Sequence, residues 1–178
     1  MKSLIFVAGI HGVGKTSWCR ERSTHVGIAH YSASTLIAQE RNELFTLDKR
    51  VDQVEENQLL LLSAVRRICV SQRFLLDGHF CLVNKGNAVE RVPYQTFADI
   101  NPSGIILLKD DVCSIYDRLG ARDAQHYDLS FLEKFQNAEM EYAQYVSGKL
   151  RCPFSIITPT STFDLTGFVS ECYKEGTL

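Results

Sequence analysis

The sequence predicts an α/β protein of three layers, in which helices cover both faces of a central, mostly parallel sheet. Short apolar runs alternate with longer helix-like segments along the whole chain. The first run, residues 4–8, is wholly apolar and ends at Gly9, as is typical of a buried parallel strand. Alternating strands and helices favour a parallel sheet with right-handed crossovers. Ligands of such proteins bind at the carboxyl ends of the strands.

The predicted strands are short apolar runs between polar segments. They cover residues 4–8, 28–31, 74–76, 105–108 and 155–158. Residues 79–93 are expected to form two short extended pieces joined by a turn at residues 84–87, because asparagine and glycine favour turns. Gly9, Asp77 and Lys109 each follow a predicted strand, so we expect them to converge on one crevice.

The predicted helices alternate with these strands. They cover residues 14–22, 34–44, 51–69, 111–119, 129–146 and 163–173. The pattern is clearest in residues 51–69, where Leu59, Leu62 and Val65 recur on one face among charged residues. Ser34 is the expected N-cap of its helix. Residues 120–128 are polar and are expected to form a mobile connection.

Composition limits the class of protein. The 178 residues suit one domain, residues 1–178, and 45% apolar with 22% charged residues is ordinary for a soluble globular chain. The net charge of −2 argues against a nucleic-acid partner. No apolar stretch is long enough for a signal peptide or a membrane span, so the cytoplasm is the expected location. The six cysteines form no Cys-x-x-Cys pair and are expected to be reduced thiols, most of them buried.

Residues 9–16, Gly-Ile-His-Gly-Val-Gly-Lys-Thr, match the phosphate-loop pattern G-x-x-x-x-G-K-[ST] between a strand and a helix. Glycines let the backbone N–H groups point inward at an anion, and the helix start adds a positive dipole end. The alternative is a glycine-rich turn that only caps a helix. The expected nucleotide-binding residues are Gly9, His11, Gly12, Val13, Gly14, Lys15, Thr16 and Ser17.

Chemistry assigns roles around this loop. Lys15 is expected to reach the β- and γ-phosphates of ATP, and the hydroxyl of Thr16 to bind Mg²⁺. Asp77 ends a predicted strand and is the expected second Mg²⁺ ligand, directly or through water; the alternative is a turn with Gly78. His79 could contact phosphate, steer an acceptor or relay a proton, and could equally be a half-buried histidine bonded to backbone.

Two arginines, Arg118 and Arg122, are spaced to share one face of a helix. Arginines that close over the site stabilise the charge of a phosphoryl group in transfer. Gly120 and the polar residues beyond it suggest a lid at about residues 118–130 that excludes water. The alternative is a solvated helix end in which Arg122 pairs with Asp123, and the pattern alone favours that alternative.

The acceptor side is expected at about residues 32–72. Arg41 and Arg50 lie in this region, and Arg91 lies in a later segment of the same side. Any of the three could clamp a phosphate or carboxylate of the acceptor. Each alone could also be a surface residue.

These motifs resemble the P-loop nucleoside and nucleotide kinases, and among them the archaeal-type adenylate kinases. The resemblance rests on residues 9–16 and continues through 48–50, 77–79, 118–123 and 135–143. It implies a nucleotide-kinase fold that uses ATP and Mg²⁺. It also implies catalytic roles for Lys15, Arg118 and Arg122.

The sequence departs from this family on the acceptor side. Glu139 and Met140 stand near a position where the family often has an arginine. Residues 80–92 lack the family's Gly/Pro-rich stretch, and Ser32-Ala33-Ser34 replaces a glycine and an acid. The resemblance therefore covers the ATP half of the site and leaves the acceptor open.

We therefore predict an enzyme that moves the γ-phosphate of ATP to a small acceptor, with a nucleotide or nucleoside expected. The alternative is a P-loop ATPase or nucleotide-gated regulatory module, which would act on a protein partner. A kinase acting on a nucleic-acid end is disfavoured by the net charge of −2, because binding to a nucleic-acid backbone relies on clustered Lys and Arg.

Overall fold

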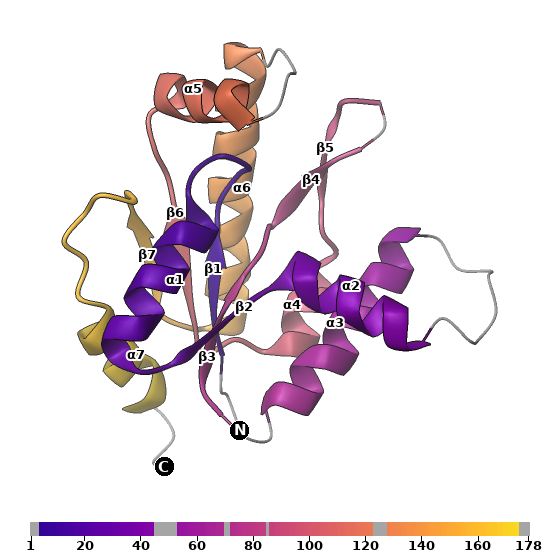
Figure 1. Cartoon of the computed structure of the whole chain (residues 1–178), viewed down its shortest axis with the longest axis vertical. Helices are drawn as coiled ribbons and strands as arrows, with labels where there is room; N and C mark the ends of the chain where they lie inside the picture. The colour runs from indigo at the N-terminus through magenta and orange to yellow at the C-terminus, as the bar shows by residue number, and fades with distance from the viewer. Residues whose placement is uncertain (1–3, 45–52, 70–71, 85, 123–127, 175–178) are drawn as a thin grey trace.

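The computed structural model describes residues 4–44, 53–69, 72–84, 86–122 and 128–174 (Figure 1). Its centre is a five-stranded sheet in the order β2-β3-β1-β6-β7, and every neighbouring pair in it is parallel. The strands are β1 Leu4–Ala8, β2 Ala29–Ser32, β3 Phe74–Asp77, β6 Gly104–Leu108 and β7 Phe154–Ile157. The α/β fold class predicted from the sequence is confirmed.

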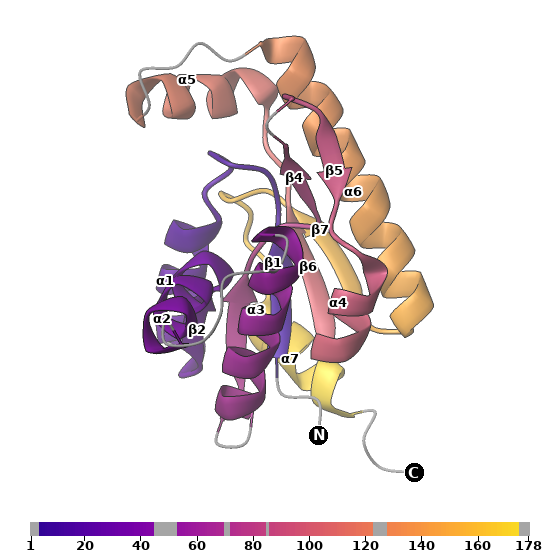
Figure 2. The ribbon, with the colours of Figure 1, turned by 90° about the vertical axis from the view of Figure 1, so that its right-hand side faces the viewer.

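Helices lie on both faces of this sheet. They are α1 Lys15–Val26, α2 Ala33–Leu44, α3 Gln53–Cys69, α4 Tyr94–Ile100, α5 Val112–Arg122, α6 Leu129–Leu150 and α7 Leu165–Lys174. Helix α1 packs on β1, β2 and β3 and contacts α7, whereas α6 runs along β6 beside α4. Figure 2 shows α1 and α6 on opposite sides of the sheet. Within the described ranges, no helix combines the length and apolarity needed to cross a membrane.

The core is centred on the three inner strands. Every residue of β1, β3 and β6 is buried, including Ile5, Leu75 and Ile106. Strands covered on both faces need continuous apolar runs, and this explains why these segments do not alternate with polar residues. Burying such a side chain contributes about 1.5–3 kcal/mol, so the inner strands form a rigid base for the loops that follow them.

A separate hairpin, β4 Cys81–Val83 and β5 Val89–Arg91, is antiparallel and stands apart from the main sheet. It confirms the two extended pieces expected within residues 79–93. The side chain of Asn84 stabilises the turn, because its Oδ1 accepts hydrogen bonds from the N–H groups of Gly86 and Ala88. The hairpin leads into α4, which the sequence analysis did not assign, since seven residues are too few to show a helical period.

Several helix boundaries differ from the prediction. Helices α1 and α6 each end four residues later than expected, and two further differences lie near the carboxyl ends of the strands. Helix α2 begins at Ala33, so Ser34 lies in its first turn and is not the N-cap; the Ser34 hydroxyl lies 3.0 Å from that of Ser32. Helix α5 runs through Gly120 to Arg122, so the polar connection begins three residues later than expected. Gly120 is tolerated there at a cost of about 1 kcal/mol relative to alanine. Residues 123–127 lie outside the described part of the chain.

Candidate functional site

A cavity of about 820 Å³ opens at the carboxyl ends of β1, β2 and β3. The loop after β1, helices α2, α3 and α4, and the face of α5 all contribute to its walls. This is where ligands bind in sheets of this topology. Ten of the predicted site residues line it, namely His11, Gly12, Gly14, Lys15, Thr16, Ser17, Arg41, Asp77, His79 and Arg118.

Glycines shape the loop between β1 and α1. Gly9 and Gly12 have φ angles of 146° and 78°, which L-residues rarely adopt. A Cβ on Gly9 would lie 2.6 Å from the carbonyl oxygen of Leu108, and one on Gly12 would lie 2.7 Å from Cγ of Leu119. Both positions therefore require glycine for conformation and for space. Gly9 and the buried Val13 do not line the cavity, so they support the loop from behind.

Lys15 brings a positive charge to the cavity wall. It is the first residue of α1, and its side chain is buried. Its Nζ donates hydrogen bonds to the carbonyl oxygens of Gly9 at 2.7 Å and Ile10 at 3.0 Å. The ammonium group thus folds over the loop that would hold an anion. Thr16 and Ser17, at the exposed start of the same helix, add hydroxyl groups and a positive dipole end.

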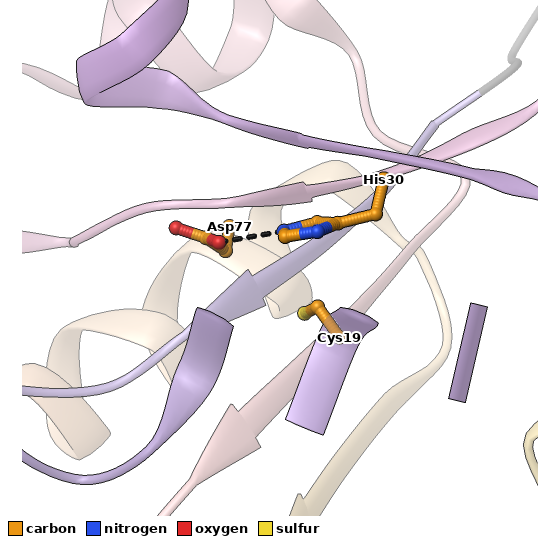
Figure 3. A group of neighbouring side chains, drawn as sticks. All are labelled: Cys19, His30 and Asp77. Carbon is orange, nitrogen blue, oxygen red and sulfur yellow. Dashed lines mark hydrogen bonds and ion pairs between the residues drawn. The ribbon is translucent and has the colours of Figure 1, made fainter. Parts of the chain in front are cut away.

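Asp77 ends β3 and is held by a histidine. Its Oδ2 lies 2.7 Å from Nε2 of His30, and both side chains are largely buried. Figure 3 shows Oδ2 facing His30 while the other carboxylate oxygen points away from it, with Cys19 of α1 nearby. The N–H of Gly78 donates to the carbonyl oxygen of Val7, which ties the end of β3 to β1.

The oxygen atoms present suit Mg²⁺. Thr16 and Asp77 both line the cavity beside the loop, and hydroxyl and carboxylate oxygens are the donors that this hard cation takes. The two residues predicted to hold Mg²⁺ are thus brought to the same wall. Their role as metal ligands stays a prediction.

His79 lies between the loop and the rest of the cavity. Its ring centroid is 4.2 Å from that of His11, and its Nδ1 is buried with no hydrogen-bond partner among the described residues. Burial, and next the positive charge of Lys15, hold the pKa of His79 well below its usual value, although a hydrogen bond with the backbone of Gly9 opposes this. The imidazole is therefore neutral at neutral pH and can accept a hydrogen bond, whereas burial and the charge of Lys15 disfavour its protonation.

Glu139 is a site residue that the sequence analysis did not select. This buried carboxylate of α6 accepts hydrogen bonds from the backbone N–H groups of Gly9 at 3.2 Å, Phe80 at 2.8 Å and Cys81 at 2.6 Å. It thereby ties the loop to the segment that carries His79. Burial raises the pKa of Glu139 to about 7, against the effect of those hydrogen bonds and of Lys15.

A signal for Glu139 was present in the sequence. It lies on the apolar face of the predicted helix, in line with Leu132, Phe135 and Ala143, where an acid requires partners. The sequence analysis noted Glu139 only as a departure from the adenylate-kinase pattern. The groups that make burial of this carboxylate possible are backbone N–H groups of Gly9, Phe80 and Cys81, far away in the sequence. Because every residue type except proline has such a group, the sequence does not reveal which ones bind Glu139.

The two arginines of the predicted lid lie on α5. Arg118 lines the cavity and pairs with Asp110 at 2.6 Å, with its side chain 42% exposed. Arg118 thus lies within a helix, and the lid itself stays a prediction. Arg122 is the last residue of α5, one turn further along. The side chain of Arg122 and its alternative partner Asp123 lie outside the described part of the structure.

The acceptor-side arginines have different surroundings. Arg41 of α2 lines the cavity and donates to Oδ1 of Asn57 on α3. Nε of Arg41 and Nε2 of Gln58 are buried and find no acceptor within the described ranges. Arg91 lies outside the cavity, because the β4–β5 hairpin places its guanidinium 5.0 Å from the ring centre of Tyr142. Arg50 falls outside the described residues.

Comparison with the sequence patterns of known protein families shows to which family this chain belongs. The sequence pattern of the AAA domain family matches residues 8–136. The chain belongs to the AAA domain family. In this AAA domain the match begins at the end of β1 and reaches α6, so it includes the loop, Asp77 and Arg118. No curated protein sequence matches the chain.

Solved structures share the fold. A shikimate kinase from Bacteroides thetaiotaomicron is 13% identical, with a TM-score of 0.55 over 96% of this chain and 94% of that one. A shikimate kinase from Acinetobacter baumannii, in complex with shikimate, is 12% identical, with a TM-score of 0.52 over 89% and 84%. A gluconokinase from Sinorhizobium meliloti is 14% identical, with a TM-score of 0.48 over 96% and 89%. The likeness to the two shikimate kinases confirms the fold, and the resemblance to adenylate kinases stays a prediction.

Proposed function

We propose that this AAA domain is an ATP-dependent kinase that transfers the γ-phosphate of ATP to a small acceptor, with a nucleotide or nucleoside expected. The supporting observation is that one cavity joins the phosphate loop to a second recess between α2, α3 and α4. An ATPase needs only the first part. Two solved structures of the same fold are named as kinases of a small molecule, shikimate, which agrees with this proposal.

The loop and α1 bind the triphosphate. The backbone N–H groups at the helix start and the hydroxyl of Ser17 are placed to bind phosphate oxygens. Lys15 exchanges its hydrogen bonds with the carbonyl groups of Gly9 and Ile10 for bonds to the β- and γ-phosphates. Thr16 and Asp77 would hold Mg²⁺, which would supply positive charge against the phosphates when bound with ATP.

The second recess suits an acceptor with an apolar body and a polar end. Ile37, Leu61 and Phe97 form apolar walls. Arg41 and Gln58 line this recess, and each also has a buried N–H group with no acceptor among the described residues. We expect a phosphate, carboxylate or carbonyl oxygen of the acceptor to pair with these groups after a small side-chain movement. An unsatisfied buried donor costs about 1–3 kcal/mol, so an acceptor that pairs with these groups binds more tightly.

Between the two halves, His79 and the arginines act on the transfer step. The neutral ring of His79 accepts a hydrogen bond from the acceptor hydroxyl. As that oxygen bonds to the γ-phosphorus, the bond to the leaving ADP oxygen breaks, and the hydroxyl proton passes to the transferred phosphoryl group. Arg118, and Arg122 one turn further, provide positive charge for the equatorial oxygens. If the acceptor is a phosphate, the same histidine donates or accepts a hydrogen bond and no proton transfer is needed.

The test is ADP release measured on a panel of nucleosides, nucleoside monophosphates and small phosphorylated or hydroxylated metabolites. We expect at least one acceptor to raise the rate well above that with water alone. Lys15→Ala should abolish this acceptor-dependent rate, because the charge stabilisation of the transition state is lost. Lys134→Ala, at an exposed site on α6, is the matched control and should retain it. A rate that no acceptor changes would refute the kinase and leave the ATPase.

A further inference from the structure

Three side chains with different donor atoms meet behind the phosphate loop. Cys19 of α1, His30 of β2 and Asp77 of β3 each offer one ligand atom, and these atoms all lie within 4.8 Å of one another (Figure 3). Cys19 and Asp77 are buried, at 0% and 4% exposure, and His30 is half-buried. Such a thiol, imidazole and carboxylate set, from three separate elements, is a donor set found in zinc sites.

We propose that Cys19, His30 and Asp77 form a binding site for a divalent transition-metal ion of the Zn²⁺ class. Sulfur and nitrogen donors favour such ions, whereas Mg²⁺ and Ca²⁺ take oxygen donors. The site is therefore chemically distinct from the oxygen pair of Thr16 and Asp77, although it shares Asp77. It does not depend on the proposed kinase activity.

The geometry requires only small side-chain movements. Tetrahedral Zn²⁺ has bonds of about 2.0–2.3 Å, so its ligand atoms lie about 3.5 Å apart. The Nε2 of His30 and Oδ2 of Asp77 are already 2.7 Å apart and would separate, and the sulfur atom of Cys19 lies within 4.8 Å of a ligand atom of each. Asp77 lines the cavity, which gives an ion a way in and leaves a position for water as the fourth ligand.

The alternative is a His30–Asp77 hydrogen bond with a thiol packed beside it. Burial, and next the negative charge of Asp77, raise the pKa of the Cys19 thiol well above its usual range. The positive charge of a bound cation would instead stabilise the thiolate form of Cys19. On binding, the thiol proton leaves to solvent, and the proton between His30 and Asp77 moves to the other ring nitrogen. The protein thus releases one proton, and its affinity for the ion should rise with pH.

Titration with Co²⁺ tests the site, because a cobalt–thiolate bond absorbs in the near ultraviolet and tetrahedral Co²⁺ absorbs strongly in the visible. The parent should carry Cys113→Ser, which removes an exposed thiol outside the cluster. We expect one Co²⁺ per chain with both absorptions, and bleaching by excess Zn²⁺, whose filled d shell is colourless. Excess Zn²⁺ should also raise the melting temperature of the parent.

When Cys19→Ser is added to this parent, it should abolish the thiolate absorption of Co²⁺ and the rise in melting temperature with Zn²⁺. His30→Gln keeps the thiol and should weaken Co²⁺ binding at least about tenfold, as loss of a ligand-orienting group already does. Circular dichroism checks that each variant is folded, and the spectrum of the parent decides the proposal even if Cys19→Ser does not fold. No thiolate absorption in the parent, an unchanged absorption in Cys19→Ser, or an unchanged Co²⁺ affinity in His30→Gln would overturn it.

Discussion

Replacing Glu139 with glutamine should change how the stability of the protein depends on pH. In the folded protein the pKa of Glu139 is raised to about 7 from an ordinary value of 4.5. The folded state therefore binds this proton more tightly than the unfolded state between those two values. By linkage, the contribution is fully present below pH 4.5 and is lost as the pH rises through 7.

The size of the effect follows from the two pKa values. Their difference corresponds to about 3 kcal/mol of unfolding free energy. Glutamine does not titrate. Between pH 4.5 and 8 the wild type should lose about 3 kcal/mol of unfolding free energy that Glu139→Gln does not lose. The unfolding free energy of the variant minus that of the wild type should therefore rise by the same amount. At low pH the variant should still be less stable than the wild type, because the amide NH₂ places a donor against the N–H of Cys81.

Urea unfolding of both proteins across this pH range measures the difference directly, and the titrations of all other groups cancel. The control is Glu133→Gln, which removes an exposed carboxylate of the same helix and should show no such pH dependence. A difference between Glu139→Gln and the wild type that stays constant with pH would refute the reasoning. It would mean that the three backbone N–H groups outweigh burial and keep the carboxylate charged throughout.

Three further substitutions test the loop, the lid and the acceptor recess. Gly12→Ala should lower the free energy of unfolding by about 2 kcal/mol, measured by urea unfolding, because it places a methyl group against Leu119 at a positive φ; no loss would contradict this packing. Arg122→Ala should lower turnover far more than ATP affinity, and an effect on ATP affinity alone would argue against a catalytic lid. Arg41→Gln should raise the acceptor KM at least about tenfold with kcat little changed, since it removes an anion partner; an unchanged KM would exclude Arg41 from the acceptor site.

The fold was predictable because its signals are local. Apolar runs such as residues 4–8 and 105–108 predict buried parallel strands, and they form the inner sheet. The phosphate loop was equally predictable, because its backbone has positive φ angles at Gly9 and Gly12 and such angles favour glycine. Helix α4 was not predictable, because a seven-residue helix after a proline shows no period.

The rest of the candidate site depends on contacts between distant segments. Nothing near His30 in the sequence indicates Asp77 as its partner, 47 residues later, because the pairing arises only when β2 and β3 lie side by side. The placement of Arg91 on Tyr142 likewise follows from the direction of the hairpin. Residue types therefore predicted the phosphate-loop half of the candidate site, and the fold was needed to separate Arg41 from Arg91.

The contact between Glu139 and Gly9 also bears on how the chain is made. One backbone N–H group of the phosphate loop, that of Gly9, is paired by a side chain that is synthesised 130 positions later. During translation this hydrogen bond can therefore form only after α6 has left the ribosome. Chains truncated before residue 139 should carry the complete phosphate-loop sequence and yet bind nucleotide poorly. Nucleotide binding would thus report that synthesis has passed α6.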